Sequence, residues 1–435
     1  MDALDLVSAP LRPFRVLCPI PEDPESVADR GAEVRPRDVG LTRAAVERIG
    51  DRVREVYRTG LYPAVQVALL RHGGLVLSRS YGHVRGGAPG DPPGAPKVPC
   101  RVDTPFNIFS ASKAVTAMVI HLLEERGLFH LDDPVCEYIP EFGHHGKHRI
   151  TIRHILAHRA GIPNLPPEAL DLDLLSHPDE ICRLLCELRL SSRPGRFLAY
   201  HAVTGGFVLG ELVRRVTGRD IRDVLRKEIA EPLGLCTLGY GIAPERLEEV
   251  AENAFTGFPP VPPISLLLER ALGADIHRVV ELSNDPRFLL GVLPAANVCT
   301  PAEELARFYQ CLLQEGELDG VRVFDRRTVR RATAEQSIWE IDFTLGVPLR
   351  YGLGFMLGGR WLSPYGPDTP EAFGHVGLSN IFSWADPERQ IAVAILTSGK
   401  PLLTLDVARI FQLMLEIGRA CPKVAHRRPR GGRAW

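Results

Sequence analysis

Residues 103–127 read DTPFNIFSASKAVTAMVIHLLEERG, and this stretch decides the fold. Its second part predicts a helix over Ser110–Gly127, because apolar side chains recur there at helical spacing, at Val115, Met118, Val119, Leu122 and Leu123. Ser110 and Lys113 stand at the start of that helix. They are three residues apart and therefore share one face of it. The segment thus combines an apolar helix with two reactive side chains at its N-terminal end.

The pair Ser110 and Lys113 suits nucleophilic catalysis. A serine hydroxyl becomes a nucleophile when a base removes its proton, and a lysine amine can act as that base where burial lowers its pKa. A helix N-terminus adds free backbone N–H groups and the positive end of a dipole, which favour developing negative charge. Ser112 is the weaker candidate, because position 115 is Val and offers it no lysine. By itself the tetrapeptide Ser110-Ala111-Ser112-Lys113 is a weak signal, because such a sequence often arises by chance in an ordinary, solvated helix start.

Strands are predicted at both ends of the chain, with helices between them. A helix at 41–59 precedes a hairpin within Pro63–Tyr81 that turns at His72-Gly73-Gly74. The C-terminal cluster has strands at Tyr351–Leu357, Ser379–Ala385 and Gln390–Leu396, followed by a helix at 402–418. Further helices are predicted at Ile150–His158, 178–190, 203–217, 219–230 and 301–315, whereas 255–297 is predicted to be irregular. The fold class is therefore α+β: an antiparallel sheet of strands from both chain ends, flanked by helices, beside a mostly helical lobe.

Composition and charge exclude several classes of function. The chain has 435 residues, 45% of them hydrophobic and 24% charged, as in ordinary globular proteins. Lys and Arg number 52 against 53 Asp and Glu, so no global field attracts nucleic acid or an anionic membrane. No run approaches the roughly 18 apolar residues that a membrane span needs. We therefore expect neither a nucleic-acid partner nor a membrane span.

The cysteines and the first residues predict a cytoplasmic protein. The nine Cys are irregularly spaced and form no CxxC pair, which suits a reducing compartment. Cys182 and Cys186 are expected to face a core from a helix. The N-terminal MDALDLVSAPLRPF has no apolar core of the kind a signal peptide requires.

Further blocks of sequence point to a known family. PGRFLAYHAVTGG at 194–206 places Tyr200 at the start of a helical run, and HVG at 375–377 precedes a predicted strand. The other blocks, in order along roughly residues 40–418, are DTPFNIFSASK, HLDDPVCEYIPEF, ITIRHILAHRAGIP, EPLGLCTLGYG, LPAANVCTPAEELARF, and FGHVG with WADPERQIAVAIL. In these blocks the sequence resembles the serine β-lactamase-like hydrolases, which carry an SxxK signature. The group includes class C β-lactamases, DD-peptidases of the carboxypeptidase type and family VIII carboxylesterases.

The resemblance implies a β-lactamase/transpeptidase-like fold and a set of roles. Ser110 would be the nucleophile, Lys113 its basic partner, and Tyr200 would share the general acid and base work. The backbone N–H groups of Ser110 and Leu378 would form the oxyanion hole. We expect no cofactor and no metal.

The remaining expected site residues are His375, Gly377 and Ala202, on the substrate side of the site. His375 would lie beside the substrate's carboxylate or leaving group, although a packed histidine at a strand end is an equally good interpretation. Three positions depart from the penicillin-recognising pattern: Ala202 replaces an Asn, His375 a Lys and Val376 a Thr. A methyl group cannot replace the hydrogen bonds of an amide, so these departures favour the esterase branch.

We therefore expect a serine hydrolase that cleaves a small-molecule carboxylic ester through an acyl-Ser110 intermediate. Its substrate pocket is expected to be built by 164–192 and 255–297. The alternatives are a β-lactamase or D-Ala peptidase-type amidase, an acyltransferase, and an inactive binding protein with the same fold. No GxSxG occurs, which excludes the nucleophile elbow of an α/β-hydrolase. His154 and His158 have the spacing of a zinc site, but Ile155 stands where a general-base Glu is needed, so a packing role is expected.

The blocks also predict the domain organisation. An extended arm at 1–40 would precede a single catalytic domain at 41–420, made of two interleaved lobes, with the helical lobe at about 110–300. A basic, flexible tail would follow at 421–435. The oligomeric state is left open.

Overall fold

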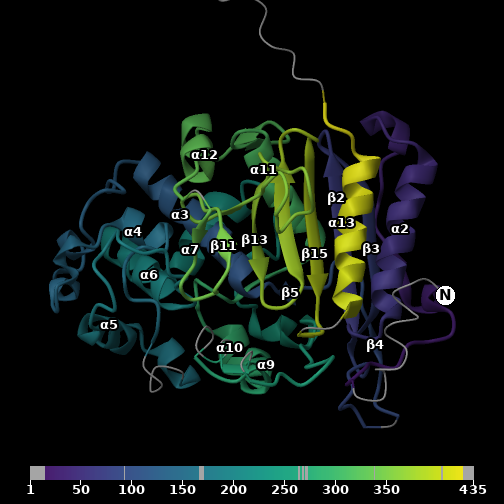
Figure 1. Ribbon diagram of the computed structural model, residues 1–435, viewed down its shortest axis with the longest axis horizontal. Helices are drawn as coiled ribbons and strands as arrows, with labels where there is room; N and C mark the ends of the chain where they lie inside the picture. The colour runs from purple at the N-terminus through teal and green to yellow at the C-terminus, as the bar shows by residue number, and fades with distance from the viewer. Residues whose placement is uncertain are drawn as a thin grey trace, which may run out of the picture.

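The computed structural model describes most of the chain (Figure 1), namely residues 15–92, 94–165, 171–262, 265, 266, 269, 273–337, 339–402 and 405–424. Residues 1–14 of the predicted arm and 425–435 of the predicted tail lie outside the described residues. The division into an arm, one catalytic domain and a tail stays a prediction.

The main sheet is antiparallel and joins strands from both ends of the chain, which confirms the predicted sheet. Its order is β1-β3-β2-β15-β14-β13-β12, and β4 pairs with the far end of β3. The strands are β1 (Ala28–Arg30), β2 (Ala64–Arg71), β3 (Gly74–Arg85), β4 (Val98–Pro99), β12 (Met356–Leu357), β13 (Phe373–Gly377), β14 (Ile381–Asp386) and β15 (Ile391–Thr397). The central pair, β2 with β15, brings together residues more than 300 positions apart in sequence.

The helices and shorter strands complete the α+β fold. The helices are α2 (Arg43–Arg58), α3 (Ser112–Glu125), α4 (Ile152–Leu156), α5 (Pro178–Glu187), α6 (Thr204–Thr217), α7 (Ile221–Leu225), α9 (Ile276–Asn284), α10 (Pro286–Leu290), α11 (Ala302–Leu313), α12 (Arg326–Thr333) and α13 (Ala408–Ala420). Small sheets are formed by β5 (Phe106–Asn107), β6 (Gly239–Tyr240) and β7 (Val298–Thr300), by β8 (Glu317–Leu318) and β9 (Val321–Arg322), and by β10 (Glu340–Ile341) and β11 (Pro348–Leu349).

Helices cover both faces of the main sheet. The side chains of β15 face different helices on the two sides. Ile391, Val393 and Ile395 point into the core shared with α2 and α13, which pack against each other on that face (Figure 1). The alternate residues, Ala392 and Ala394, face α11 on the other side. Because successive side chains of a strand point to opposite faces, a strand buried on both reads as a continuous apolar run. The small alanines let α11 pack close to the sheet.

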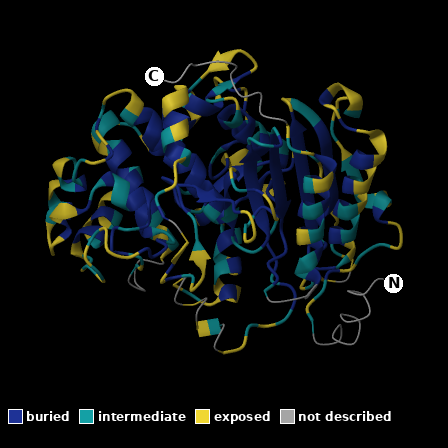
Figure 2. Cartoon of the chain, turned by 45° about the horizontal axis from the view of Figure 1, so that its top comes forward, coloured by how far each residue is buried: buried dark blue, intermediate teal, exposed yellow. Residues whose placement is uncertain are grey.

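Helix α3 lies at the centre of the molecule. Every residue from Ser112 to Leu123 is buried, and Figure 2 shows the interior elements almost wholly in the buried colour. A helix that is apolar all round is a core helix. The reactive side chains at its N-terminal end are therefore held by a rigid element.

The structure also corrects parts of the sequence-based prediction. Within 255–297, predicted to be irregular, α9 and α10 form, and Asp275 caps α9 by accepting a hydrogen bond from the Arg278 amide at 3.1 Å. Both helices are short, so few apolar periods were available to reveal them. Residues 28–30 of the predicted arm pair with β3 as edge strand β1. Cys182 and Cys186 are buried, as expected.

None of the helices in the described part of the chain is both long enough and apolar enough to cross a membrane.

Candidate active site

Ser110 lies in a single 3-10 turn, Phe109–Ala111, that leads directly into α3. The residue before it, Phe109, has φ = 46°, a left-handed conformation that non-glycine residues rarely adopt. The Asn107 side chain supports this turn, because its Oδ1 accepts a hydrogen bond from the Phe109 amide at 3.2 Å. Strained backbone of this kind is characteristic of functional sites.

Strand β7 holds the nucleophile turn from both sides. Before the turn, the Ile108 amide donates to the Val298 carbonyl at 2.9 Å. After it, the Ser112 hydroxyl oxygen accepts from the Val298 amide at 3.0 Å. Ser112 is thus fully buried with its hydroxyl oxygen already hydrogen-bonded, whereas the Ser110 hydroxyl contacts the Lys113 amine.

Lys113 contacts Ser110 one turn along the helix. Its Nζ lies 3.2 Å from the Ser110 Oγ, 2.7 Å from the Ala202 carbonyl oxygen and 3.0 Å from the Ala295 carbonyl oxygen. The two carbonyls can only accept hydrogen bonds. A neutral amine has two N–H groups and one lone pair. With both N–H groups directed at the carbonyls, the lone pair faces the Ser110 hydroxyl, which is the arrangement that a general base needs.

Burial sets the protonation state of Lys113. It removes water from the charged form and lowers the pKa of this amine to about 7. In the described part of the chain, no carboxylate forms an ion pair with Lys113 that would restore the charge. Near neutral pH, a substantial fraction of the amine is therefore unprotonated.

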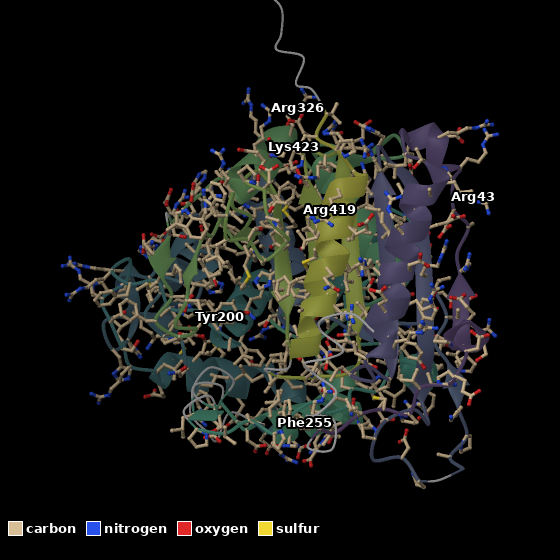
Figure 3. All side chains as sticks on the ribbon, turned by 45° about the vertical axis from the view of Figure 1, so that its right-hand side comes forward. Arg43, Tyr200, Phe255, Arg326, Arg419 and Lys423 are labelled. Carbon is tan, nitrogen blue, oxygen red and sulfur yellow. The ribbon has the colours of Figure 1, made fainter. Side chains whose placement is uncertain are left out.

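Tyr200 brings a second hydroxyl to the same place. Figure 3 labels it inside the molecule, where the sheet meets the helical part of the chain. Its side chain hydrogen-bonds Ser110, and its ring lies 4.8 Å from the Lys113 Nζ. Burial and the nearby Asp342 carboxylate raise the pKa of Tyr200 above its usual value. The phenol therefore keeps its proton at neutral pH and can donate it.

Leu378 and Gly377 bring β13 up to the nucleophile turn. Among the described residues, neither the Ser110 nor the Leu378 amide has a hydrogen-bond acceptor. Both residues line one pocket. A Cβ at Gly377 would lie 2.3 Å from the Ile108 carbonyl oxygen, so only glycine permits this close approach. Gly377 is needed at this position because it has no side chain. It is not among the described residues that line the pocket.

His375 is buried behind the site surface, with 1% of its area exposed. Its Nδ1 donates to the Val376 carbonyl at 2.9 Å, which leaves Nε2 without a proton when the ring is neutral. Burial and the neighbouring Lys113 lower the pKa of His375 to about 3. The ring lies 6.4 Å from that of Tyr200 between centroids and is not among the described pocket residues. This geometry matches the packed-histidine interpretation.

An apolar pocket opens beside Ser110, with about 130 Å³ of free space. Its described lining comes from the two segments predicted to build it, from the turn around Ser110, from the start of α6 and from the loop after β13: Phe109, Ser110, Leu165, Asp171, Leu172, Leu175, Ala202, Val203, Phe207, Ala274, Val279, Leu282, Ser283, Phe288, Leu293, Ala296 and Leu378. The lining includes one carboxylate, Asp171, and no cationic side chain among the described residues. Such a lining suits the binding of an apolar group.

Several supporting residues were not predicted. Asp342 is fully buried, and its Oδ1 accepts hydrogen bonds from the amides of Tyr200, Thr344 and Leu345 at 3.1, 2.9 and 3.0 Å. It thereby fixes the backbone of Tyr200. Ala202 was predicted on the substrate side, and it lines the pocket beside Ser110. Its carbonyl oxygen and that of Ala295 also accept hydrogen bonds from Lys113, a backbone role that no side-chain motif can reveal. The sequence Asp342-Phe343-Thr344 matches no catalytic motif and suggests at most a turn, so Asp342 carried no signal of its own.

His158 packs as predicted, whereas His154 caps a helix, a role that was not predicted. His158 accepts a hydrogen bond from the His201 amide on its Nδ1 at 3.2 Å, and its ring lies 4.7 Å from that of Tyr200. His154 completes a capping box with Thr151 at the start of α4. In the described part of the chain, no group of three or more potential ligands could hold a metal ion.

Comparison with known proteins gives consistent matches. A family model described as beta-lactamase matches residues 49–415. The esterase/beta-lactamase LipL of Mycobacterium tuberculosis is 35% identical over 334 residues, which are 72% of this chain and 73% of LipL.

Solved structures agree with the sequence matches. A penicillin-binding protein homologue from Caulobacter crescentus superposes with a TM-score of 0.74 at 26% identity, covering 88% of this chain and 99% of the other. A family VIII carboxylesterase gives a TM-score of 0.74 at 24% identity over the same shares of the two chains. These likenesses confirm the predicted β-lactamase/transpeptidase-like fold.

Proposed function

The chain belongs to the β-lactamase family, and the proteins similar to it include an esterase and a penicillin-binding protein homologue. On this basis we propose that it hydrolyses neutral carboxylic esters through an acyl-Ser110 intermediate. The observation that carries this proposal is the contact of the Lys113 amine with the Ser110 hydroxyl, at 3.2 Å, beside an apolar pocket.

The first half of the reaction forms the acyl-enzyme. The Lys113 lone pair takes the proton of Ser110 as its Oγ attacks the ester carbonyl carbon. The negative charge that develops on the carbonyl oxygen is held by the amides of Ser110 and Leu378, each such donor being worth about 2.7–4 kcal/mol in the chemical step. Tyr200 or the protonated Lys113 then gives a proton to the leaving alkoxide. The alcohol departs and the acyl group stays on Ser110.

The second half reverses these roles. A water molecule takes the place of the alcohol and loses its proton to the same base, and the tetrahedral intermediate breaks down to carboxylic acid and free Ser110. The number of protons at the site is restored at the end of each cycle. An alcohol in place of water would give acyl transfer by the same steps.

The lining of the pocket supports an ester over a β-lactam or a D-Ala-D-Ala peptide. Both of the latter substrates carry a carboxylate, whose removal from water is costly without a cation. The described pocket residues include Asp171 and no cation, and the amide-binding Asn of the family is Ala202 here. The printed name of LipL, esterase/beta-lactamase, supports an esterase and keeps the β-lactam as the competing substrate to test.

The test compares p-nitrophenyl butyrate with nitrocefin. We expect ester turnover by the wild-type chain, loss of that turnover in Ser110→Ala, and little or no nitrocefin hydrolysis. The matched control is Ser191→Ala, a serine that lies outside the pocket lining and hydrogen-bonds the Gly161 carbonyl. Equal ester turnover by Ser110→Ala would sink the proposal. Efficient nitrocefin turnover with weak ester turnover would replace it with a β-lactamase.

A further inference from the structure

Large apolar side chains are exposed along a hairpin that the proposed chemistry does not use. Trp339 precedes β10, Ile341 ends it, and Phe343 lies in the turn that follows. Ile341 and Phe343 are 59% and 58% exposed, and Trp339 is exposed as well. Asp342, between Ile341 and Phe343, is fully buried, and its carboxylate accepts a hydrogen bond from the Tyr200 amide. The hairpin therefore carries exposed apolar side chains next to a residue that contacts the candidate site.

Two neighbouring segments contact these side chains and carry further exposed apolar residues. The Phe197 ring packs edge-on against the Phe343 ring at 5.0 Å between centroids. At the other end, the Trp339 indole lies against Gly359, whose added Cβ would meet it at 3.0 Å. Loop 359–362 continues with Trp361, which is 85% exposed, and with exposed Leu362. We call these residues the aromatic surface: Phe197, Trp339, Ile341, Phe343, Trp361 and Leu362.

Two arginines stand on its aromatic rings. The Arg196 guanidinium lies 4.7 Å from the centre of the Phe197 ring, and that of Arg360 lies 5.3 Å from the Trp361 ring. Neither forms an ion pair with a carboxylate in the part of the chain that the structure describes. By contrast, Glu340 on the hairpin is neutralised by Arg159, which lies after α4, at 2.6 Å. The surface thus combines exposed tryptophans with unneutralised positive charge.

We propose that the aromatic surface docks the protein on an anionic lipid surface. Trp and Tyr favour the boundary between lipid head groups and acyl chains, because their rings are apolar while retaining a polar edge. Arginines beside them meet anionic head groups. The near-zero net charge of the whole chain is compatible with this, since the positive charge is local and acts within a Debye length of the surface.

The position of the surface relates it to the site. Asp342 and Phe343 are consecutive: the carboxylate of the first holds the Tyr200 amide, and the amide of the second donates to the Leu198 carbonyl at 2.9 Å. The docking surface and the catalytic tyrosine are therefore parts of one connected loop pair. Docking does not depend on turnover, so it is tested on the Ser110→Ala chain. Failure of the docking proposal is therefore distinguishable from failure of the proposed ester hydrolysis.

The experiment is co-sedimentation of full-length Ser110→Ala with vesicles of phosphatidylcholine and phosphatidylglycerol in equal amounts. We expect binding that weakens in pure phosphatidylcholine and at high salt. Trp361→Ala should weaken partitioning about tenfold, as the loss of one buried apolar side chain implies. A double variant with Arg196→Gln and Arg360→Gln should bind both kinds of vesicle equally, without a preference for phosphatidylglycerol. Phe411→Ala, an exposed aromatic on α13 outside the surface, is the matched control and should bind as the parent does.

Three results would overturn the proposal. The first is no sedimentation with either vesicle, and the second is binding that Trp361→Ala leaves unchanged. The third is a stable dimer in sedimentation-velocity runs that Trp361→Ala dissociates, since the surface would then be an interface between two copies. Circular dichroism of each variant confirms that a change in binding does not come from unfolding.

Discussion

The Lys113 amine lies 3.2 Å from the Ser110 hydroxyl oxygen and has two backbone carbonyls, but no carboxylate in the described structure, as its other partners. This relationship gives the amine a lone pair directed at the nucleophile. It is produced by local sequence, because three residues along one helix bring the side chains together, and by distant sequence, because Ala202 and Ala295 supply the carbonyls.

Removing the amine should stop proton transfer. Lys113→Ala should lower kcat/KM for p-nitrophenyl butyrate by about 10²–10⁴-fold, the usual contribution of a general base. Steady-state kinetics measure it, with Lys97→Ala, an exposed lysine, as the control. A variant with more than half of the wild-type rate would show that another group is the base.

The pH dependence of the rate should report the same amine. The pKa of Lys113 is lowered to about 7, and the reactive form is the unprotonated one. The value of kcat/KM should therefore rise about tenfold per pH unit below pH 7 and level off above it. A profile that is flat between pH 5.5 and 8.5 would be incompatible with Lys113 as the base.

A second buried lysine, Lys400, should make the free energy of unfolding depend on pH. Lys400 is fully buried, donates to the Thr397 carbonyl at 2.7 Å and lies 4.8 Å from the Phe109 ring centre. Burial lowers its pKa to about 7, whereas the unfolded chain has the ordinary lysine value. Between these values the unfolded state binds one more proton, so stability rises with pH by about 1.4 kcal/mol per unit from this group.

Lys400→Met should remove that contribution. The free energy of unfolding, from urea titrations at pH 7.5 and 9, should then increase less with pH than it does in the wild type. Lys97→Met is the control and should leave the pH dependence unchanged. An unaltered slope in Lys400→Met would mean that the buried amine stays charged.

Gly377 should tolerate no side chain. In Gly377→Ala the new Cβ would meet the Ile108 carbonyl at 2.3 Å, which pushes β13 and the Leu378 amide away from the nucleophile. We expect kcat to fall at least about tenfold, as for a displaced oxyanion donor. Gly239→Ala, where the nearest atom lies at 3.7 Å, should behave as the wild type. Equal activity of both variants would disprove the steric argument.

Chain-length preference should follow the size of the pocket. Leu282 lines it from α9 and is only partly buried, so Leu282→Trp should fill free space without disturbing the core. The ratio of kcat/KM for p-nitrophenyl octanoate to that for the acetate should fall about tenfold or more. Glu281→Trp, at an exposed position of the same helix, should leave the ratio unchanged. An unchanged ratio in Leu282→Trp would place the acyl chain elsewhere.

The sequence predicts the parts of the fold that have strong local patterns. The sheet follows from continuous apolar runs such as Ala64–Arg71 and Ile391–Thr397, and α3 from its unbroken apolar face. Helices α9 and α10 escape prediction because each has few turns, and an apolar pattern needs several turns to be recognised. The pairing of residues 28–30 with β3 has no local signature, since a three-residue edge strand takes its register from its neighbour.

The candidate site likewise contains residues that the sequence predicts and residues that it does not. Ser110, Lys113 and Tyr200 are predicted because they belong to motifs. Asp342 and the Ala295 carbonyl are not, because one acts through a turn far along the chain and the other through backbone that every residue has. His375 is the opposite case. Its motif position predicts a site residue, but the structure buries its ring.

The most direct test of the central claim is mass spectrometry of the chain after treatment with a fluorophosphonate. The account predicts one adduct, located on Ser110 by peptide mapping and absent from Ser110→Ala, with labelling that slows below pH 7 as Lys113 becomes protonated. An adduct on another residue, persistent labelling of Ser110→Ala, or no labelling at all would contradict it.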